Sequence, residues 1–220
     1  MNLHFMIDIL TVSCGRRLYL GRLMDSIERN GGDLSGVTMR LFNNGVAHSI
    51  EGTFPVHAVS LAERHSVGAV MQIAKSYLDK PLVIKLDDDA EIISNKFFDV
   101  LYEIARLKPN TIFSPFPVGL INNRGGPRGT SHEVVYSEKL DRYFTLRKSE
   151  HVGGFARVMP AEMFKQVPFT DAHDEDSNVS AWARAAGVEM FYLENGFIVE
   201  HQESTLGQHA RDESYFQGRF

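Results

Sequence analysis

A short aliphatic run that ends in three consecutive acids constrains this chain more than any other stretch. Leu82–Asp89 (LVIKLDDD) begins after Pro81 and is too short for a helix of its own, so it predicts a buried β-strand. Ionised carboxylates are costly to bury unless a cation neutralises them. Because open α/β sheets bind ligands at the carboxyl ends of their strands, the three acids predict a site for a hard divalent cation. The alternative is a polar loop in which one or two aspartates cap the next helix.

The composition is that of one globular domain. The chain has 220 residues, of which 43% are hydrophobic and 23% charged, and this length suits one well-packed domain. The single cysteine, Cys14, excludes an intramolecular disulfide and a cysteine-built zinc site. The formal net charge of −5 argues against an extended nucleic-acid footprint. Because no apolar stretch reaches membrane-spanning length and the N-terminus does not resemble a signal peptide, we expect a cytoplasmic protein without an integral membrane segment.

Strand-like and helical segments alternate along the first part of the chain. The expected strands are His4–Val12, Val37–Phe42, Phe54–Ser60, Leu82–Leu86 and Thr111–Phe116. The expected helices follow Arg17, cover Ala62–Leu78, and begin after a cap at Ser94 or Asn95. This alternation predicts an α/β fold with a layered sheet.

The middle of the chain changes character at Asn122–Ser131 (NNRGGPRGTS), which lacks an apolar anchor and predicts an exposed loop. Its two arginines, Arg124 and Arg128, suit a phosphate or an anionic acceptor. A solvated linker is the alternative. Two further segments, Val134–Leu146 and His151–Met159, predict strands.

A second acidic group, Asp174–Asp176, precedes a helix that ends at Gly187. The helix dipole stabilises carboxylates at this position, but capping needs only one of them. The last expected strands are Met190–Leu193 and Phe197–Val199, and the second runs into His201. The sequence therefore contains two acid clusters, each at the end or the start of a regular element.

In this order the stretches resemble a nucleotide-sugar-dependent glycosyltransferase of the GT-A fold, similar to the large inverting group known as family two. The resemblance covers roughly Ile7 to His201 and depends on motif order. It implies one domain over residues 1–220 with a Rossmann-related, mixed and mainly parallel central sheet flanked by helices. The nucleotide-binding half would be about 1–120, the acceptor-binding half about 121–208, and the tail 209–220.

The resemblance implies contacts to the nucleotide from three residues that precede the acidic run. Thr11 matches the end of the first family strand, which contacts the nucleoside. Asn43, in Asn43–Gly45, stands where the family has an acid that holds the base or ribose, and it keeps hydrogen-bonding capacity without charge. Arg64 matches the next family turn loosely and would face the diphosphate.

Asp87–Asp89 resembles the family's Asp-x-Asp signature. By that resemblance Asp87 would approach the ribose and share in holding the metal, Asp89 would ligate the metal, and Asp88 would assist one or the other. The implied cofactor is Mn²⁺ or Mg²⁺, because carboxylates beside a diphosphate need a cation between them. His201 resembles a histidine that some members use as a further metal or phosphate ligand.

Glu175–Asp176 resembles the family's Glu-Asp pair, and His151–Phe155 resembles the strand beside its acceptor site. By this resemblance, Asp176 would be the general base that takes the proton of an acceptor hydroxyl, beside its acidic neighbour Glu175. The implied activity is metal-dependent, inverting transfer of a hexosyl or pentosyl group from a nucleotide diphosphate sugar, and we expect the nucleotide to be UDP. The hydroxyl acceptor is left open among a glycan, a protein, a small molecule and a modified DNA base, as is the oligomeric state.

Two other functions fit parts of the sequence. A nucleotidyltransferase of related fold would need a Gly-rich basic loop near the N-terminus, of which Ser13–Arg17 is a faint version. A non-catalytic nucleotide-sugar-binding protein fits Asn43 and the loose match at Arg64.

Overall fold

The computed structural model describes residues 6–47, 49–118, 131–170, 175–194 and 198–201. Twelve strands and five α-helices lie in these ranges. The strands are β1 (Ile7–Ser13), β2 (Val37–Asn44), β3 (Val56–Leu61), β4 (Leu82–Leu86), β5 (Ala90–Ile92), β6 (Ile112–Ser114), β7 (Phe116–Val118), β8 (His132–Ser137), β9 (Arg142–Lys148), β10 (Ala156–Pro160), β11 (Met190–Leu193) and β12 (Ile198–His201). The helices are α1 (Arg17–Asn30), α2 (Val67–Ala74), α3 (Phe97–Leu107), α4 (Ala161–Gln166) and α5 (Glu175–Ala186), and a 3₁₀ turn (Lys75–Tyr77) follows α2.

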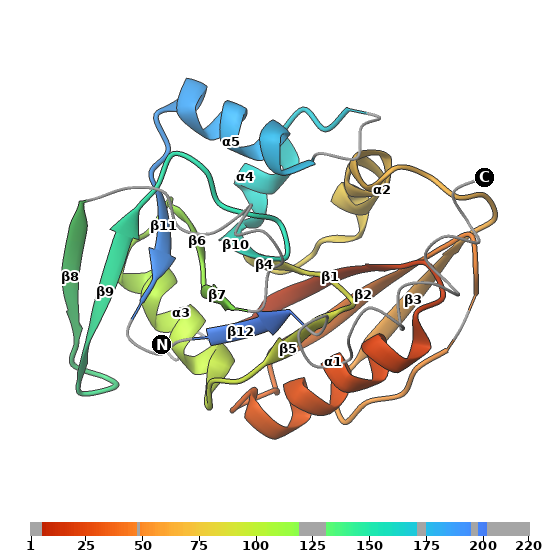
Figure 1. Cartoon of the computed structure of the whole chain (residues 1–220), viewed down its shortest axis with the longest axis horizontal. Helices are drawn as coiled ribbons and strands as arrows, with labels where there is room; N and C mark the ends of the chain where they lie inside the picture. The colour runs from red at the N-terminus through yellow and green to blue at the C-terminus, as the bar shows by residue number, and fades with distance from the viewer. Residues whose placement is uncertain (1–5, 48, 119–130, 171–174, 195–197, 202–220) are drawn as a thin grey trace.

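Nine of the strands form one mixed sheet in the order β3-β2-β1-β4-β10-β6-β11-β9-β8 (Figure 1). Strands β3, β2, β1 and β4 are parallel neighbours, and β11 is parallel to β6. Strand β10 runs antiparallel between β4 and β6, and the β8–β9 hairpin closes one edge. The two halves expected from the sequence therefore share one sheet, because β10 comes from the second half and lies against β4 from the first.

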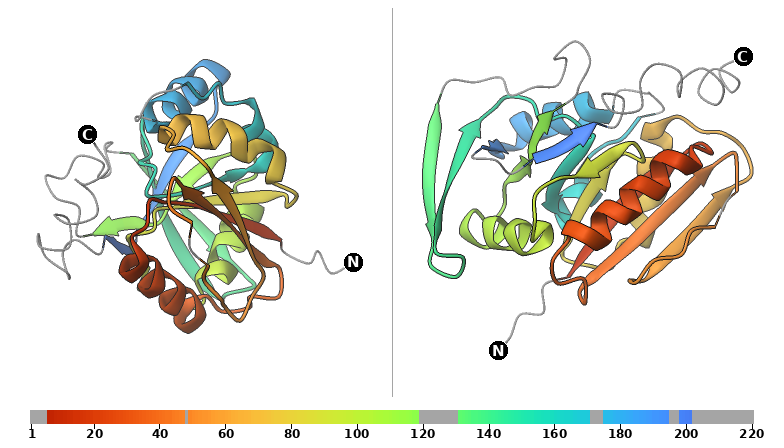
Figure 2. Two further views of the ribbon diagram at one scale, coloured as in Figure 1. Left: turned by 90° about the vertical axis from the view of Figure 1, so that its right-hand side faces the viewer. Right: turned by 60° about the horizontal axis from the view of Figure 1, so that its bottom comes forward.

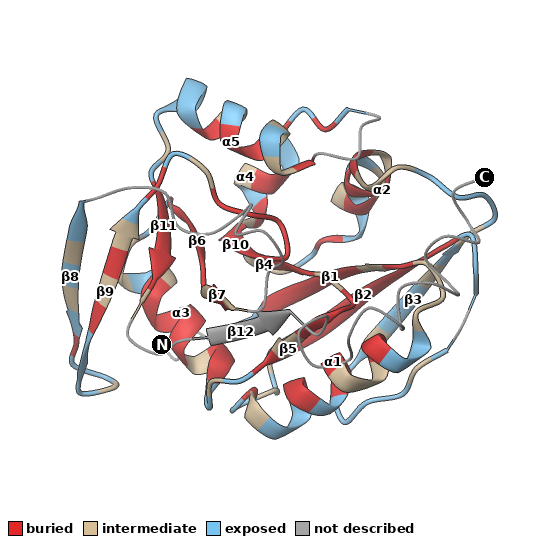
Figure 3. Cartoon of the chain, in the orientation of Figure 1, coloured by how far each residue is buried: buried red, intermediate tan, exposed pale blue. Residues whose placement is uncertain are grey.

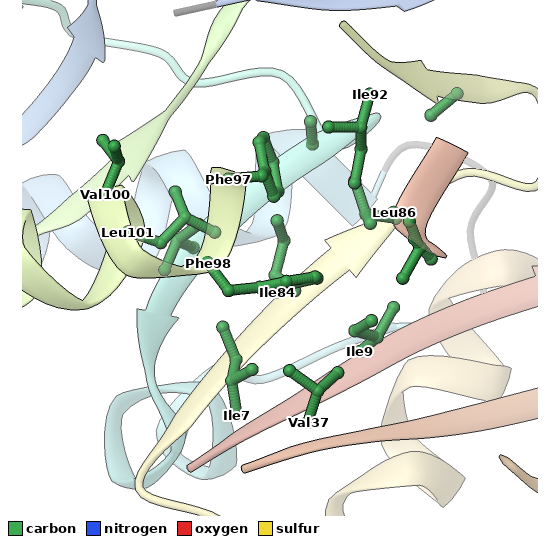
Figure 4. Close-up of a cluster of buried hydrophobic side chains, with 14 of the residues drawn as sticks. Ile7, Ile9, Val37, Ile84, Leu86, Ile92, Phe97, Phe98, Val100 and Leu101 are labelled. Carbon is green, nitrogen blue, oxygen red and sulfur yellow. The ribbon is translucent and has the colours of Figure 1, made fainter. Parts of the chain in front are cut away.

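Helices cover both faces of this sheet, so its central strands are almost continuously buried (Figures 2 and 3). One core cluster joins the sheet to α1 and α3, and contains Ile84, Leu86 and Phe97 (Figure 4). The other joins the opposite face to α2, α4 and α5, and contains Leu10 and Val83. The aliphatic residues of β4 thus alternate between two cores, as expected for a buried strand.

A small second sheet lies beside the carboxyl end of β4. Its order is β5-β12-β7, with β12 antiparallel to β5 and parallel to β7. Strand β5 begins at Ala90, directly after the acidic run, and the register pairs Ala90 with His201. This arrangement returns the end of the described chain to the acidic end of β4.

Two expected helices begin later than the sequence suggested. The helix expected over Ala62–Leu78 begins after Ser66, whose side chain accepts a hydrogen bond from the Ala69 backbone amide. The next helix is not capped by Ser94 or Asn95, because Lys96 with a φ of 54° precedes its first residue.

Two expected strands differ from the sequence interpretation in extent. The run Thr111–Phe116 divides at Pro115 between β6 in the large sheet and β7 in the small one, because proline has no amide to donate to a ladder. The run His151–Met159 is a strand only from Ala156, and its first part forms a turn.

Candidate active site

The carboxyl ends of β1, β2 and β4 lie at the same edge of the sheet because these strands are parallel. Ser13 at the end of β1 pairs in register with Asn43 near the end of β2. Thr11 and Asn43 are both buried, and the hydroxyl oxygen of Thr11 has no hydrogen-bond partner among the described residues. Two of the residues expected to contact a nucleotide therefore lie at the edge where a ligand of this kind of sheet would bind.

Asn44 holds the loop that carries Arg64 through two hydrogen bonds to the next residue, His65. The Asn44 amide nitrogen donates to the His65 carbonyl at 2.8 Å, and the His65 amide donates to Asn44 Oδ1 at 2.8 Å. Gly45, with a φ of 84°, packs its Cα against Arg64 and turns the chain away from β2. The exposed Arg64 is thus tethered to the end of β2.

Arg16, which the sequence analysis did not select, forms ion pairs with two of the three acids after β4. Its guanidinium contacts Asp88 through two nitrogens and donates to Asp89 Oδ2 at 2.7 Å. Asp88 is fully buried and Asp89 is 5% exposed. Burial, opposed by Arg16 and reinforced by the charge of Asp89, raises the pKa of Asp88 to about 6.

Lys85 connects the two acid clusters. Its ammonium contacts Asp87 and lies 2.8 Å from Glu175 Oε1. Lys85 is 5% exposed, and although burial would lower its pKa, the charges of Asp87 and Glu175 raise the pKa above its usual value. The lysine therefore remains charged, and the acids after β4 and at the start of α5 belong to one site.

Glu175 and Asp176 form the first turn of α5 and face β10. Arg157 of β10 donates from Nη1 to Asp176 Oδ1 at 3.0 Å. Gly154 lies against both carboxylates, since a Cβ added there would overlap Asp176 Oδ1 and lie 2.5 Å from Glu175 Oε1. The absence of a side chain at Gly154 is what lets the acid pair approach the backbone.

The two carboxylates of this pair differ in proton affinity. Burial would raise the pKa of Glu175, but Lys85 and Arg157 outweigh it and lower the pKa to about 2. Burial and the charge of Glu175 raise the pKa of Asp176, against the opposing charges of Arg157 and Lys85. Asp176 keeps 27% of its side chain exposed, so it combines access with a raised pKa, as a general base requires.

The turn before β10 is held by two polar side chains, from β11 and α5, and by one backbone hydrogen bond from the acidic run. Gly153 donates its amide hydrogen to the Tyr192 hydroxyl at 2.9 Å, and Ser180 of α5 contacts His151 Nδ1 at 2.8 Å. The Asp87 amide donates to the Phe155 carbonyl at 2.9 Å, which ties this turn to the acidic run. These contacts hold the turn next to both acid clusters.

The structure brings most of the expected site residues to one region. Asp87, Asp88, Asp89, Glu175 and Asp176 lie around the carboxyl end of β4. The backbone of His201 pairs with Ala90, next to Asp89, while its side chain lies outside the described part of the structure, as do Asp174, Arg124 and Arg128.

Sequence reasoning missed three cations, the partly buried Arg16 and the buried Lys85 and Arg157. Lys85 and Arg157 each interrupt an apolar strand, at LVIKL and ARVMP. A charged residue inside a buried strand needs a partner of opposite sign. That signal could have identified both residues before the structure was known.

Among the described residues, no helix is long and apolar enough to cross a membrane. The sequence matches no protein-family model and no curated protein. Solved structures of S. aureus TarS are similar in fold. TarS 1–349 in complex with UDP-GlcNAc superposes with a TM-score of 0.66 at 12% sequence identity, over 94% of this chain and 61% of that chain. TarS 1–349 in complex with UDP gives a TM-score of 0.62 at 12% identity, over 89% and 60%.

This chain thus spans about three fifths of the length of TarS 1–349, and 38% of the longer TarS structure. The likeness establishes the fold class, which is that of a GT-A-like glycosyltransferase with a mixed, mainly parallel sheet in a single domain. The fold expected from the order of motifs is therefore confirmed.

Proposed function

We propose that this protein transfers a sugar from a nucleotide diphosphate sugar to an acceptor hydroxyl. The observation that carries the proposal is the contact of Lys85 with both Asp87 and Glu175. It joins the acids at the carboxyl end of β4 to those at the start of α5 within one site. The similarity in fold to TarS, whose structures contain UDP-GlcNAc and UDP, supports a UDP-linked donor.

The donor lies, in this proposal, across the carboxyl ends of β1, β2 and β4. Thr11 and Asn43 bind the nucleoside, and Asp87 approaches the ribose. Asp88 supports this edge through its pairing with Arg16. Arg64, on the loop held by Asn44, faces the diphosphate, because a guanidinium matches phosphate oxygens.

A divalent cation fits the donor chemistry of this region. Three cations (Arg16, Lys85 and Arg157) meet five carboxylates there, which leaves two negative charges when all eight groups are ionised. In the described part of the chain, no three His, Cys, Asp or Glu side chains form a metal-binding group.

Asp89 and Asp87 are the carboxylates that would hold Mn²⁺ or Mg²⁺. His201 would be a further ligand, because its backbone pairs with that of Ala90, the residue after Asp89. When bound, such an ion supplies positive charge to the departing nucleoside diphosphate.

The transfer step uses the second acid cluster. Asp176 accepts the proton of the acceptor hydroxyl, whose oxygen forms a bond to the anomeric carbon. The bond from that carbon to the diphosphate oxygen breaks, and the nucleoside diphosphate leaves with the bonding electrons. Attack from the face opposite the leaving group inverts the configuration. Glu175, held ionised by Lys85, fixes the start of α5 and raises the pKa of its neighbour Asp176.

A non-catalytic nucleotide-sugar-binding protein is the second candidate. The pairing of Arg16 with Asp88 and Asp89 favours it, because the protein itself already supplies a counter-charge to these two acids. The same pairing weighs against a nucleotidyltransferase, since Arg16 is engaged with carboxylates and not directed to a triphosphate by a loop of its own.

Calorimetry and product analysis with a panel of UDP-, GDP-, CDP- and ADP-sugars, each with and without Mn²⁺, test the proposal. We expect one donor to bind more tightly with Mn²⁺ and to be consumed by the wild type. Asp176→Asn should bind it and not consume it, whereas Asp89→Ala should lose the effect of Mn²⁺. Asp79→Asn, at an exposed carboxylate paired with Arg40, is the control and should behave as wild type.

Binding without consumption by the wild type would favour the binding protein. Full activity of Asp176→Asn would remove that residue from its role.

A further inference from the structure

Strand β8 forms an open edge of the nine-stranded sheet. It pairs with β9 on one side, and no other strand in the described part of the chain pairs with it. Figure 1 shows β8 at the left margin of the molecule, with no described element beyond it. Open edges are usually protected by lysine, proline or a bulge. The sequence of β8 (HEVVYS) contains neither lysine nor proline.

The hydrogen-bonding groups that β8 leaves open can be identified from its register. The Lys148 amide donates to the Ser131 carbonyl at 3.0 Å, so these two residues form a hydrogen-bonded pair. Such pairs alternate with non-hydrogen-bonded pairs along an antiparallel ladder, so every second residue after Ser131 directs its backbone groups toward β9. The residues between them, His132, Val134 and Tyr136, direct their amides and carbonyls away from the sheet.

The side chains of the same three residues are exposed on one face of the hairpin. Val134 is 60% exposed and Tyr136 is 42% exposed. Tyr143 of β9 stands opposite Tyr136, is 65% exposed, and has its ring centre 4.8 Å from that of Tyr136. The other edge strand, β3, is described over its full length and exposes no large hydrophobic side chain. Exposed apolar surface is therefore a property of the β8 edge and not of sheet edges in this chain generally.

Polar contacts hold β8 firmly against the rest of the molecule. The Ser137 hydroxyl at its end donates to the buried carboxylate of Glu103 in α3 at 2.6 Å. Glu133 pairs with Lys108, just after α3, at 2.8 Å. The edge is thus preorganised, and a strand that adds to it would not have to order it first.

We propose that a second copy of this chain pairs with β8 in antiparallel orientation, about a two-fold axis through Val134. Such an axis, perpendicular to the sheet, places two identical edge strands antiparallel. Val134 then stands opposite Val134 of the partner subunit, and His132 stands opposite Tyr136 of the partner subunit. Every outward amide and carbonyl of β8 finds a partner, and the two nine-stranded sheets become one. This inference goes beyond the proposed transfer function and does not depend on it.

The edge is complementary to itself in this register, which is why a second copy is the partner. No charge faces its own copy, because Glu133, already paired with Lys108, stands opposite Val135 of the partner subunit. An axis through Val135 would pair only two of the three outward residues and leave His132 opposite the turn that follows β8. A contact built on one six-residue strand is smaller than the roughly 1,200–2,000 Å² of a stable interface, so we expect a dimer that dissociates on dilution.

Sedimentation velocity of the full chain at about 1 to 200 μM measures this assembly, because a contact of this size should dissociate within that range. The wild type should pass from monomer to dimer. In Val134→Lys and in Val134→Glu, like charges would face each other at the axis, so the dissociation constant should rise about tenfold or more. An equimolar mixture of these two variants should form a heterodimer, because opposite charges then meet at the axis.

Ala58→Lys is the matched control, since it adds a lysine at an exposed position of the other edge strand, β3. It should dimerise as the wild type does. Because Val134 is mostly exposed, all variants should match the thermal unfolding of the wild type at a concentration where the wild type is monomeric.

A wild type that stays monomeric over the whole range would overturn the inference, as would a dimer that persists in both Val134 variants. Failure of the mixed variants to associate would show that Val134 does not face its own copy. Assemblies that grow beyond the dimer would indicate a contact between different surfaces, and they too would contradict the two-fold pairing.

Discussion

The ammonium of Lys85 lies 2.8 Å from a carboxylate oxygen of Glu175, across the boundary between β4 and α5. Both side chains are almost fully buried, at 6% and 7% exposure. A charge pair of this kind costs desolvation and is stable only while both partners are present. The pair therefore ties the position of α5 to the acidic end of β4.

Replacing Lys85 by methionine should lower the free energy of unfolding by about 3–5 kcal/mol, because Glu175 would be left as a buried carboxylate without its cation. Urea unfolding at pH 7 measures this change. The double variant Lys85→Met with Glu175→Gln should be more stable than Lys85→Met alone, since the uncompensated charge is gone. A loss below about 1 kcal/mol in the single variant would contradict a close pair.

Gly154→Ala should reduce activity by about 100-fold or more, because a Cβ at this position overlaps Asp176 and displaces the carboxylate from its place. Gly21→Ala in α1 is the matched control, since a Cβ there meets no atom within 4 Å. It should leave activity unchanged and stabilise the fold by about 0.4–1 kcal/mol. Steady-state kinetics with thermal unfolding of both variants checks this, and equal activity in the two would show that the acid pair tolerates a side chain beside it.

The pH dependence of transfer should reflect the raised pKa of Asp176. A general base works only when deprotonated, so the rate should fall as the pH drops through this pKa, which lies above the usual value for aspartate. Arg157→Met should move this acid limb to higher pH, because it removes a cation that lowers the pKa of Asp176. The measurement is kcat/KM against pH. An acid limb at or below pH 3.9, the approximate value for a free aspartate, would exclude the raised pKa.

Arg16→Ala should increase the stabilisation that Mn²⁺ confers. Without the guanidinium, Asp88 and Asp89 lose their counter-charge and attract a cation more strongly. Thermal unfolding with and without Mn²⁺ measures the effect, and each kcal/mol of linked binding should raise Tm by about 2–4 °C. Arg22→Ala, which removes a partner of Glu91 on the surface of α1, should respond to Mn²⁺ as wild type does. The same Mn²⁺ response in both variants would mean that Arg16 and the ion do not share these carboxylates.

Local patterns predicted most of the regular elements. Short apolar runs identified β1, β2 and β4, and glycine marked the end of α5, where Gly187 has a φ of 68°. These signals are available in the sequence because they depend on residues close together in the chain. The starts of α2 and α3 were less accurate, because capping by Ser66 and the backbone of Lys96 depend on how the preceding loops are held.

The two acid clusters were evident in the sequence, but their meeting was not. The sequence by itself determined a buried strand followed by Asp87–Asp89 and a helix preceded by Asp174–Asp176, because both follow from local hydrophobicity and charge. Only the tertiary structure decided that Lys85 and Arg157 would supply the cations between these clusters. Such partners come from strands that pair across the sheet, where Arg157 stands opposite Lys85, and this pairing depends on long-range packing that no local pattern encodes.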